Sequence, residues 1–112
     1  SHLSHSYHSG ACLYFTFAGK PLERDAEDRP TPAAIDRYYR EVWDEGTRAV
    51  LASGGSLSHH HGVGINRGRY MAEALGAGAD VLATLKAGLD PEGILNPGKL
   101  GIGSRFGDVD LP

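Results

Sequence analysis

Residues 31–55 read TPAAIDRYYREVWDEGTRAVLASGG, and this stretch decides the predicted fold. Thr31 offers a side-chain oxygen as an N-cap, and Pro32 suits the first helical position. Apolar and small residues then recur three and four apart, which is typical of an amphipathic helix: Ile35, Tyr38, Tyr39, Val42, Trp43, Gly46, Ala49 and Val50. We predict a helix over residues 32–52, about 31 Å long at 1.5 Å per residue, which Gly54-Gly55 ends.

Upstream of this helix, residues 11–18 read ACLYFTFA and predict a β-strand. Residues 2–6 also alternate, and residues 7–10 have the composition of a turn, so we predict an antiparallel hairpin over residues 2–18. Alternation gives this strand two faces: Leu13, Phe15 and Phe17 on one, and Cys12, Tyr14 and Thr16 on a more polar one. We expect the long helix to pack across the first face, which makes the fold α+β.

The rest of the chain is read as short helices and loops. Residues 19–31 are charged, marked by proline and without a period, which indicates a surface loop. We predict short helices over residues 66–75 and 80–87, then a shaped loop over residues 88–99. Apolar residues expected to be inward are Val81, Leu82 and Leu85 in the third helix and Ile94 and Leu95 in the loop. Residues 101–112 lack periodicity, and we expect a flexible tail.

Length and charge limit the classes of function. A chain of 112 residues can build one small core. Its net charge is −3, and no basic patch interleaved with aromatic residues is present, so we expect no nucleic-acid partner. The single cysteine, Cys12, excludes an internal disulfide, and neither a signal-peptide pattern nor an apolar run of about 18 residues occurs. We therefore expect a cytoplasmic location in a bacterium.

Residues 54–64, GGSLSHHHGVG, concentrate reactive side chains between glycines directly after the long helix. Imidazoles donate, accept and carry protons near neutral pH, and glycines let a backbone approach a ligand closely. Consecutive residues of an extended turn alternate sides, so His59 and His61 should face one way and His60 the other. The alternatives are a solvated loop without a role and a purification tag, although a tag ordinarily stands at a terminus as six or more histidines.

Several kinds of chemistry are compatible with histidines, but they are not equally supported. Adjacent imidazoles diverge, there is no CxxC pair and Cys12 stands alone, so we expect no metal site. No Gly-x-Ser-x-Gly elbow points to nucleophilic hydrolysis. Proton transfer or oxyanion stabilisation by one or two of the imidazoles fits best. Arg67 and Arg69 stand nearby and either hold a phosphate or carboxylate or lie on a solvated helix face.

Two motifs carry a family resemblance. Residues 57–64, LSHHHGVG, and residues 89–99, LDPEGILNPGK, follow the strand at residues 11–17. Together they resemble the C-terminal end of the alkyldihydroxyacetonephosphate synthases and their bacterial relatives, which are FAD enzymes of the vanillyl-alcohol oxidase group. The second motif is shared by many flavin oxidases of the group, whereas SHHHGVG is close to diagnostic of the synthase branch.

The resemblance implies that this chain is a fragment of a larger two-domain flavoenzyme. FAD would be held mainly by an N-terminal domain of the same protein, which nothing here resembles. Residues 1–100 would form the C-terminal part of the cap or substrate domain and the returning segment, and the fragment alone would be inactive. The other implied partner is a small-molecule or lipid substrate. The resemblance also allows peripheral membrane association and a homodimer of the full enzyme.

The resemblance also assigns residue roles, in an exchange that replaces the acyl group of acyl-dihydroxyacetone phosphate by a long-chain alcohol for ether lipid synthesis. The implied catalytic residues are Tyr14, His59, His60 and His61, with Tyr7 as the second choice of tyrosine. The implied ligand contacts are Asn96 and His60 for the cofactor, and Arg67 and Tyr7 for the substrate.

The chain departs from the synthase pattern at one place. Where the synthases usually continue Gly-Lys-Leu-Arg, this chain has Gly64-Ile65-Asn66-Arg67, which keeps the arginine and loses the lysine. Two other interpretations therefore stay open. The first is an FAD-linked oxidoreductase acting on a hydroxy acid or alcohol, and the second is a non-catalytic α/β interaction module.

Overall fold

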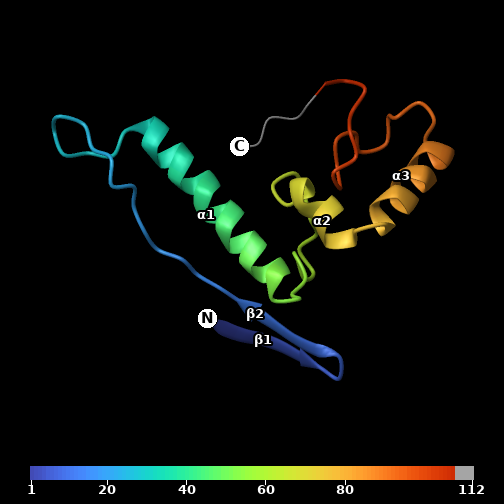
Figure 1. Ribbon diagram of the computed structural model, residues 1–112, viewed down its shortest axis with the longest axis horizontal. Coiled ribbons are helices and arrows are strands. Elements are labelled where there is room, and N and C mark those ends of the chain that lie inside the picture. The colour runs from blue at the N-terminus through green and yellow to red at the C-terminus, as the bar shows by residue number, and fades with distance from the viewer. Residues whose placement is uncertain (108–112) are drawn as a thin grey trace. The chain divides into compact units, whose positions relative to one another are not determined.

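The computed structural model describes residues 1–107 and shows an α+β arrangement, which confirms the predicted fold class (Figure 1). Its elements are β1 (His2–Tyr7), β2 (Gly10–Tyr14), α1 (Pro32–Ala52), the 3-10 turn η1 (Gly68–Tyr70), α2 (Met71–Leu75) and α3 (Gly78–Leu89). The chain divides into two compact units, residues 1–46 and the part from Thr47 onward. None of the helices described is long and apolar enough to span a bilayer.

The first unit begins with the predicted antiparallel hairpin. Strands β1 and β2 pair from Tyr7 opposite Gly10 to His2 opposite Tyr14, with an irregularity between Leu3 and His5. The turn falls at residues 8–9, as the composition predicted. The second strand ends at Tyr14, so residues 15–18 of the predicted hairpin lie outside the sheet.

The predicted packing of the hairpin is wrong. Leu13, Phe15 and Phe17 keep 52, 55 and 70% of their surface exposed, so the long helix does not cover this face. Cys12, from the face expected to be more polar, is the strand's buried residue at 8% exposed. Alternation tells which side chains share a face but not which face is covered. Phe15 and Phe17 instead stack on each other outside the strand, with ring centroids 6.4 Å apart.

Helix α1 has the predicted bounds and the predicted caps. The Thr31 side-chain oxygen accepts the N–H of Ala34 at 3.1 Å, which is an N-cap bond. At the other end, the Gly54 N–H donates to the Leu51 carbonyl and the Gly55 N–H to the Val50 carbonyl, both at 2.9 Å. These two bonds and the left-handed φ of +77° at Gly54 form a Schellman motif.

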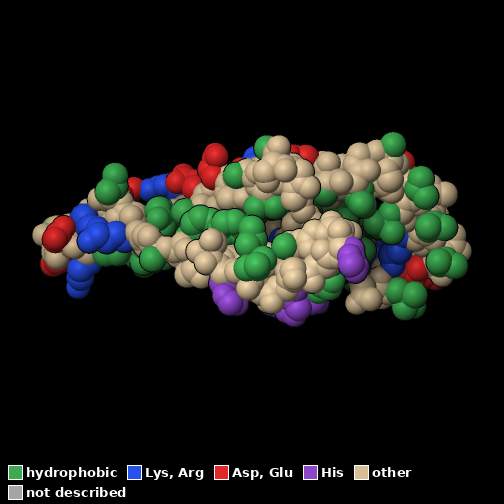
Figure 2. All heavy atoms as spheres, turned by 90° about the horizontal axis from the view of Figure 1, so that it is seen from below, with side chains coloured by type: hydrophobic (Ala, Val, Ile, Leu, Met, Phe, Trp, Pro, Cys, Tyr) green, Lys and Arg blue, Asp and Glu red, His purple; other side chains and the backbone are tan. Residues whose placement is uncertain are grey.

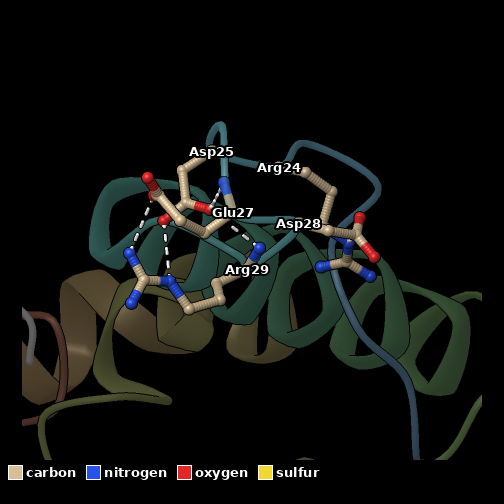
Figure 3. A network of polar contacts seen from close by, with 5 residues as sticks. All are labelled: Arg24, Asp25, Glu27, Asp28 and Arg29. Atoms are coloured by element: carbon tan, nitrogen blue, oxygen red, sulfur yellow. Dashed lines mark hydrogen bonds and ion pairs between the residues drawn. The ribbon is translucent and has the colours of Figure 1, made fainter.

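The loop before α1 is on the surface as predicted, but it has internal order (Figure 3). The Asp25 carboxylate accepts the N–H groups of Glu27 at 3.0 Å and Arg29 at 2.8 Å. The Arg29 guanidinium donates back to Asp25 at 3.1 Å and to Glu27 at 2.9 Å. The hydrogen bond from the Arg29 backbone is the main cause that lowers the pKa of Asp25. A local aspartate network, not apolar contact, therefore shapes this loop.

Tyr70 is the centre of the second unit, with 1% of its surface exposed. The guanidinium groups of Arg48 and Arg69 lie 5.5 and 4.8 Å from its ring centroid, within the range of cation–π attraction. Arg48 also donates to Glu73 of α2 at 2.7 Å. The helix predicted over residues 66–75 begins later, as the 3-10 turn at Gly68, and then continues through α2.

Helix α3 is longer than predicted, and its packing differs from the prediction. Val81 and Leu85 are 60 and 56% exposed, so of the three residues expected to be inward only Leu82 is half-buried. Leu82 lines a pocket together with Leu100 and Ile102. The spacing of apolar residues in this short helix predicts an apolar face, but only the part of that face at Leu82 packs near another segment.

The loop after α3 is shaped as predicted, but around Asp90. The expected burial of Ile94 and Leu95 is wrong, because both side chains are more than half exposed. Their backbone N–H groups donate instead to the buried Asp90 carboxylate, at 3.1 and 2.9 Å. Lys86 of α3 forms an ion pair with the same carboxylate and also donates to the Leu95 carbonyl. The Lys86 bond, followed by the backbone bonds, lowers the pKa of Asp90 against the opposing effect of burial.

The described part of the C-terminal segment contacts the rest of its unit. Arg105 donates to the Glu92 carbonyl at 2.7 Å, and Gly101 lies against the Gly68 backbone. Residues 108–112 of the predicted flexible tail lie outside the described residues, so the mobility of the tail stays a prediction.

The helix end yields a paired prediction. Gly54→Ala places a β-carbon at a φ of +77° and should destabilise the protein by about 1–2 kcal/mol. Gly46→Ala, inside α1 and with no atom within 4 Å of the new β-carbon, should stabilise it by about 0.5–1 kcal/mol. Urea denaturation measures both changes. Equal stability of the two variants would contradict the need for a left-handed residue at this helix end.

The Asp90 network predicts a dependence on pH. Because the folded pKa of Asp90 is lowered, its stabilising effect is present above the unfolded value of about 3.9 and is lost as pH falls through the folded pKa. Asp90→Asn should therefore lower Tm at pH 7, and the difference from wild type should shrink below about pH 4. Asp28→Asn, at a side chain 94% exposed, is the control and should change Tm little. A Tm difference for Asp90→Asn that stays constant across this range would refute the assignment.

Candidate functional site

The histidine loop, residues 56–64, leaves α1 directly after the Schellman motif. Gly54 and Gly55 end the helix, and three intervening residues separate Gly55 from His59. The side chains of His59, His60 and His61 are all exposed, and histidine side chains are visible on the surface in Figure 2. The end of α1 thus delivers three imidazoles to solvent, where a ligand can reach them.

The backbone of the histidine loop is strained at His60. The His61 N–H donates to the His59 carbonyl at 2.8 Å, and the intervening His60 has a φ of +61°. This is a γ-turn of the rarer hand. A non-glycine residue in such a conformation costs about 1–3 kcal/mol and persists only where its surroundings hold it, often at functional sites.

The γ-turn brings two imidazoles together. The rings of His59 and His60 stack with centroids 3.7 Å apart and planes 19° from parallel. The His60 and His61 rings are 6.5 Å apart and tilted by 37°. The prediction that His60 faces away from both neighbours is therefore wrong. It assumed an extended backbone, and the positive φ at His60 turns its side chain onto that of His59.

The Gly62 carbonyl oxygen accepts hydrogen bonds from side chains on both sides of the histidine triplet. The Ser58 hydroxyl donates to the Gly62 carbonyl at 2.7 Å, and Arg67 Nη1 donates to the same oxygen at 3.4 Å. The Ser56 hydroxyl donates to the Ser58 carbonyl at 3.2 Å. Sequence reasoning missed Ser58 and Ser56. The available signal was that serine side chains readily bond to nearby backbone groups.

The two arginines near the loop have different surroundings. Arg67, predicted to bind substrate, is half-buried and reaches the loop itself through Gly62. Arg69 is exposed and lies over the Tyr70 ring. Of the two, Arg67 is therefore the guanidinium that lies beside the histidines.

The two candidate tyrosines lie at opposite ends of the hairpin in the first unit. Tyr14 is the last residue of β2, pairs with His2 and is 37% exposed. Tyr7 is the last residue of β1, pairs with Gly10 and has its ring stacked on that of His5, with centroids 6.3 Å apart. The hairpin therefore does not bring the two hydroxyls to one place, and each is a separate candidate.

Asn96, the other predicted cofactor contact, also has an unusual backbone. Its φ is +46°, although a residue that precedes a proline is ordinarily extended. The neighbouring Leu95 is held on both sides, by its N–H to Asp90 and by its carbonyl to Lys86. The Asp90 network, which sequence reasoning missed, thus fixes the backbone that presents the exposed Asn96 side chain.

The arrangement of the described residues bears on which ligands they could hold. Between residues 1 and 107, no group of three or more histidine, cysteine or acidic side chains is placed to hold a metal ion. In the same range neither strand leads directly into a helix N-terminus, so the phosphate loop of a dinucleotide site is not formed here. The exposed imidazoles and the Asn96 amide can each donate and accept hydrogen bonds, so each can contact a polar ligand.

Comparisons with known proteins identify the family. Residues 1–100 match the family described as FAD linked oxidases, C-terminal domain. The chain is 39% identical over 101 residues to the alkyldihydroxyacetonephosphate synthase of Dictyostelium discoideum and 36% over 100 residues to that of Trypanosoma brucei brucei, covering 89 and 88% of this chain. It is also 31% identical over 99 residues, 88% of this chain, to the uncharacterized FAD-linked oxidoreductase YgcU of Escherichia coli (strain K12).

The relatives are much longer than this chain. It spans 15% of the length of each of these two synthases and 19% of the oxidoreductase. No solved structure matches the chain. The match over residues 1–100 places it in a family of flavin enzymes whose cofactor is FAD, and the chain belongs to the FAD linked oxidases, C-terminal domain family.

Proposed function

We propose that this chain is the C-terminal catalytic portion of an enzyme that exchanges the acyl group of acyl-dihydroxyacetone phosphate for a long-chain alkyl group. The observation that carries the proposal is the histidine loop, in which a strained turn presents stacked imidazoles to solvent. The identity of 36–39% to proteins named for this synthase activity supports it. FAD would be held largely by the remainder of the complete protein.

The exchange converts an ester into an ether and releases a carboxylate, so no electrons are transferred overall. The hydroxyl proton of the incoming alcohol must leave, and the departing carboxylate carries negative charge. An imidazole of the histidine loop can accept that proton, and another can donate a hydrogen bond to developing charge. FAD, when bound, supplies a ring that can take up and return electrons within the cycle.

The remaining candidate residues fall into supporting roles. Tyr14 is proposed to donate or accept a proton at the substrate, with Tyr7 as the alternative hydroxyl and as a substrate contact. Arg67, beside the loop, is proposed to attract the substrate phosphate, since a guanidinium forms charge-assisted bonds with phosphate oxygens. Asn96 and His60 are proposed to contact the flavin. Binding near a membrane surface and a homodimer belong to the same proposal for the complete enzyme.

A second candidate function is oxidation of a hydroxy acid or an alcohol by the same flavin site. The observations that favour it are the likeness to a protein named an FAD-linked oxidoreductase and the replacement of the usual lysine at residues 64–67. An oxidoreductase must pass electrons to an acceptor, whereas the exchange reaction needs none. This difference separates the two functions experimentally.

The reaction type can be tested with the complete, FAD-loaded protein. We expect palmitoyl-dihydroxyacetone phosphate and deuterated hexadecanol to give a deuterated ether product by mass spectrometry, without reduction of an artificial electron acceptor. Acceptor reduction driven by glycolate or lactate, without ether formation, would favour the oxidoreductase. If a folded, FAD-loaded protein showed neither activity, the result would favour the non-catalytic interpretation.

Substitutions test the assigned residues in the same assay. Tyr14→Phe, His59→Ala, His61→Ala and His60→Gly should divide into variants that stay FAD-loaded but lose turnover and variants with reduced loading or stability. Removing a positioned acid or base should lower turnover by about 10²- to 10⁴-fold. Glycine is chosen at position 60 because it accepts the positive φ.

Matched controls for these substitutions come from the same chain. His8→Ala removes an exposed imidazole from the hairpin turn, and Tyr39→Phe removes an exposed hydroxyl from α1. Both should keep wild-type turnover and FAD content. Wild-type turnover in all four site variants would contradict the catalytic assignment, and the triplet would then be a surface loop without a catalytic role.

A further inference from the structure

The strain at His60 requires something to hold it. The γ-turn itself contributes one hydrogen bond, from the His61 N–H to the His59 carbonyl. The three imidazoles are exposed, so burial of their side chains does not fix the turn. A bond between the residues that flank the triplet would restrict the backbone further and help to keep His60 at a φ of +61°.

The Ser58 hydroxyl provides a bond that spans the whole triplet. It belongs to the residue before His59 and donates at 2.7 Å to the carbonyl of Gly62, the residue after His61. Gly62 has a φ of +71°, so it continues the reversal that starts at His60. The bond closes a short ring around the three histidines and fixes the separation of the two ends of the turn.

The neighbouring polar groups support this bond but do not replace it. Arg67 donates to the same carbonyl, whose two lone pairs accept both donors, but at the longer distance of 3.4 Å. The Ser56 hydroxyl donates to the Ser58 carbonyl and so holds the backbone that carries the Ser58 side chain. Ser58 is therefore the short link across the turn.

We propose that Ser58 is a positioning residue of the site: its bond to the Gly62 carbonyl holds the γ-turn and keeps the His59 and His60 rings stacked. The inference rests on the proposed catalytic role of the histidines. Ser58 does not touch the reacting atoms, so its loss should misplace the imidazoles without removing them. A misplacement of about 1 Å can cost about 10²-fold in rate, and we expect kcat to fall about 10- to 100-fold with KM nearly unchanged.

The test uses the complete, FAD-loaded protein and the isosteric pair Ser58→Thr and Ser58→Val, with Ser58→Ala. Threonine and valine have nearly the same shape, and only threonine keeps the hydroxyl, so their difference isolates the hydrogen bond. Thr84→Val is the matched control, because the Thr84 hydroxyl donates to the Asp80 carbonyl at 2.8 Å within α3, outside both the histidine loop and the end of α1.

Two readouts are measured for each variant: kcat per bound flavin, and hydrogen–deuterium exchange of the backbone over residues 56–64. Ser58→Val and Ser58→Ala should lose rate and exchange faster in this segment. Ser58→Thr should keep both readouts near wild type, and Thr84→Val should change neither. The exchange measurement needs no turnover, so it tests the loop even if the proposed reaction is wrong.

Three results would overturn the proposal. The first is a Ser58→Val protein with wild-type kcat per flavin, even if its loop exchanges faster. The second is wild-type exchange over residues 56–64 in both Ser58→Val and Ser58→Ala. The third is unfolding of both these variants while Ser58→Thr folds normally, which would assign Ser58 to the fold as a whole.

Discussion

The end of helix α1 is the constraint on which the histidine loop depends. Two hydrogen bonds to the Leu51 and Val50 carbonyls, with the left-handed Gly54, stop the helix and set the direction in which the chain leaves it. The loop that follows is closed again within a few residues, by Ser58 and Arg67 on the Gly62 carbonyl. A capped helix end and a loop closed by hydrogen bonds thus set where the imidazoles lie, and the proposed proton transfer needs a positioned group.

Local signals made part of this structure predictable. The bounds of α1 follow from Thr31, Pro32 and the glycine pair, because caps act through hydrogen bonds between residues close in sequence. The hairpin turn was predictable for the same reason. Within the site, the triplet could be named from the sequence, but its γ-turn could not. Three identical residues carry no signal that says which of them takes a positive φ.

Packing was less predictable than local structure. Apolar spacing marked Leu13, Phe15, Phe17 and Val81 as residues suited to burial, and all four are exposed. An apolar pattern identifies the side chains that share a face, but it does not tell which segment of the protein covers that face. The matched synthases are several times longer than this chain, and in the complete enzyme that we propose such faces would meet its other parts. In the loop after α3 the outcome is reversed: Ile94 and Leu95 were expected to be buried, but the buried side chain that organises the loop is the charged Asp90.

Whether the histidine loop faces the reaction site can be seen in a crystal structure of the complete protein with FAD bound. We expect the γ-turn at His60 and at least one imidazole nitrogen of the triplet within about 2.6–3.2 Å of the flavin or a bound substrate. A triplet that faces solvent, with the flavin and substrate site formed entirely by other residues, would contradict it.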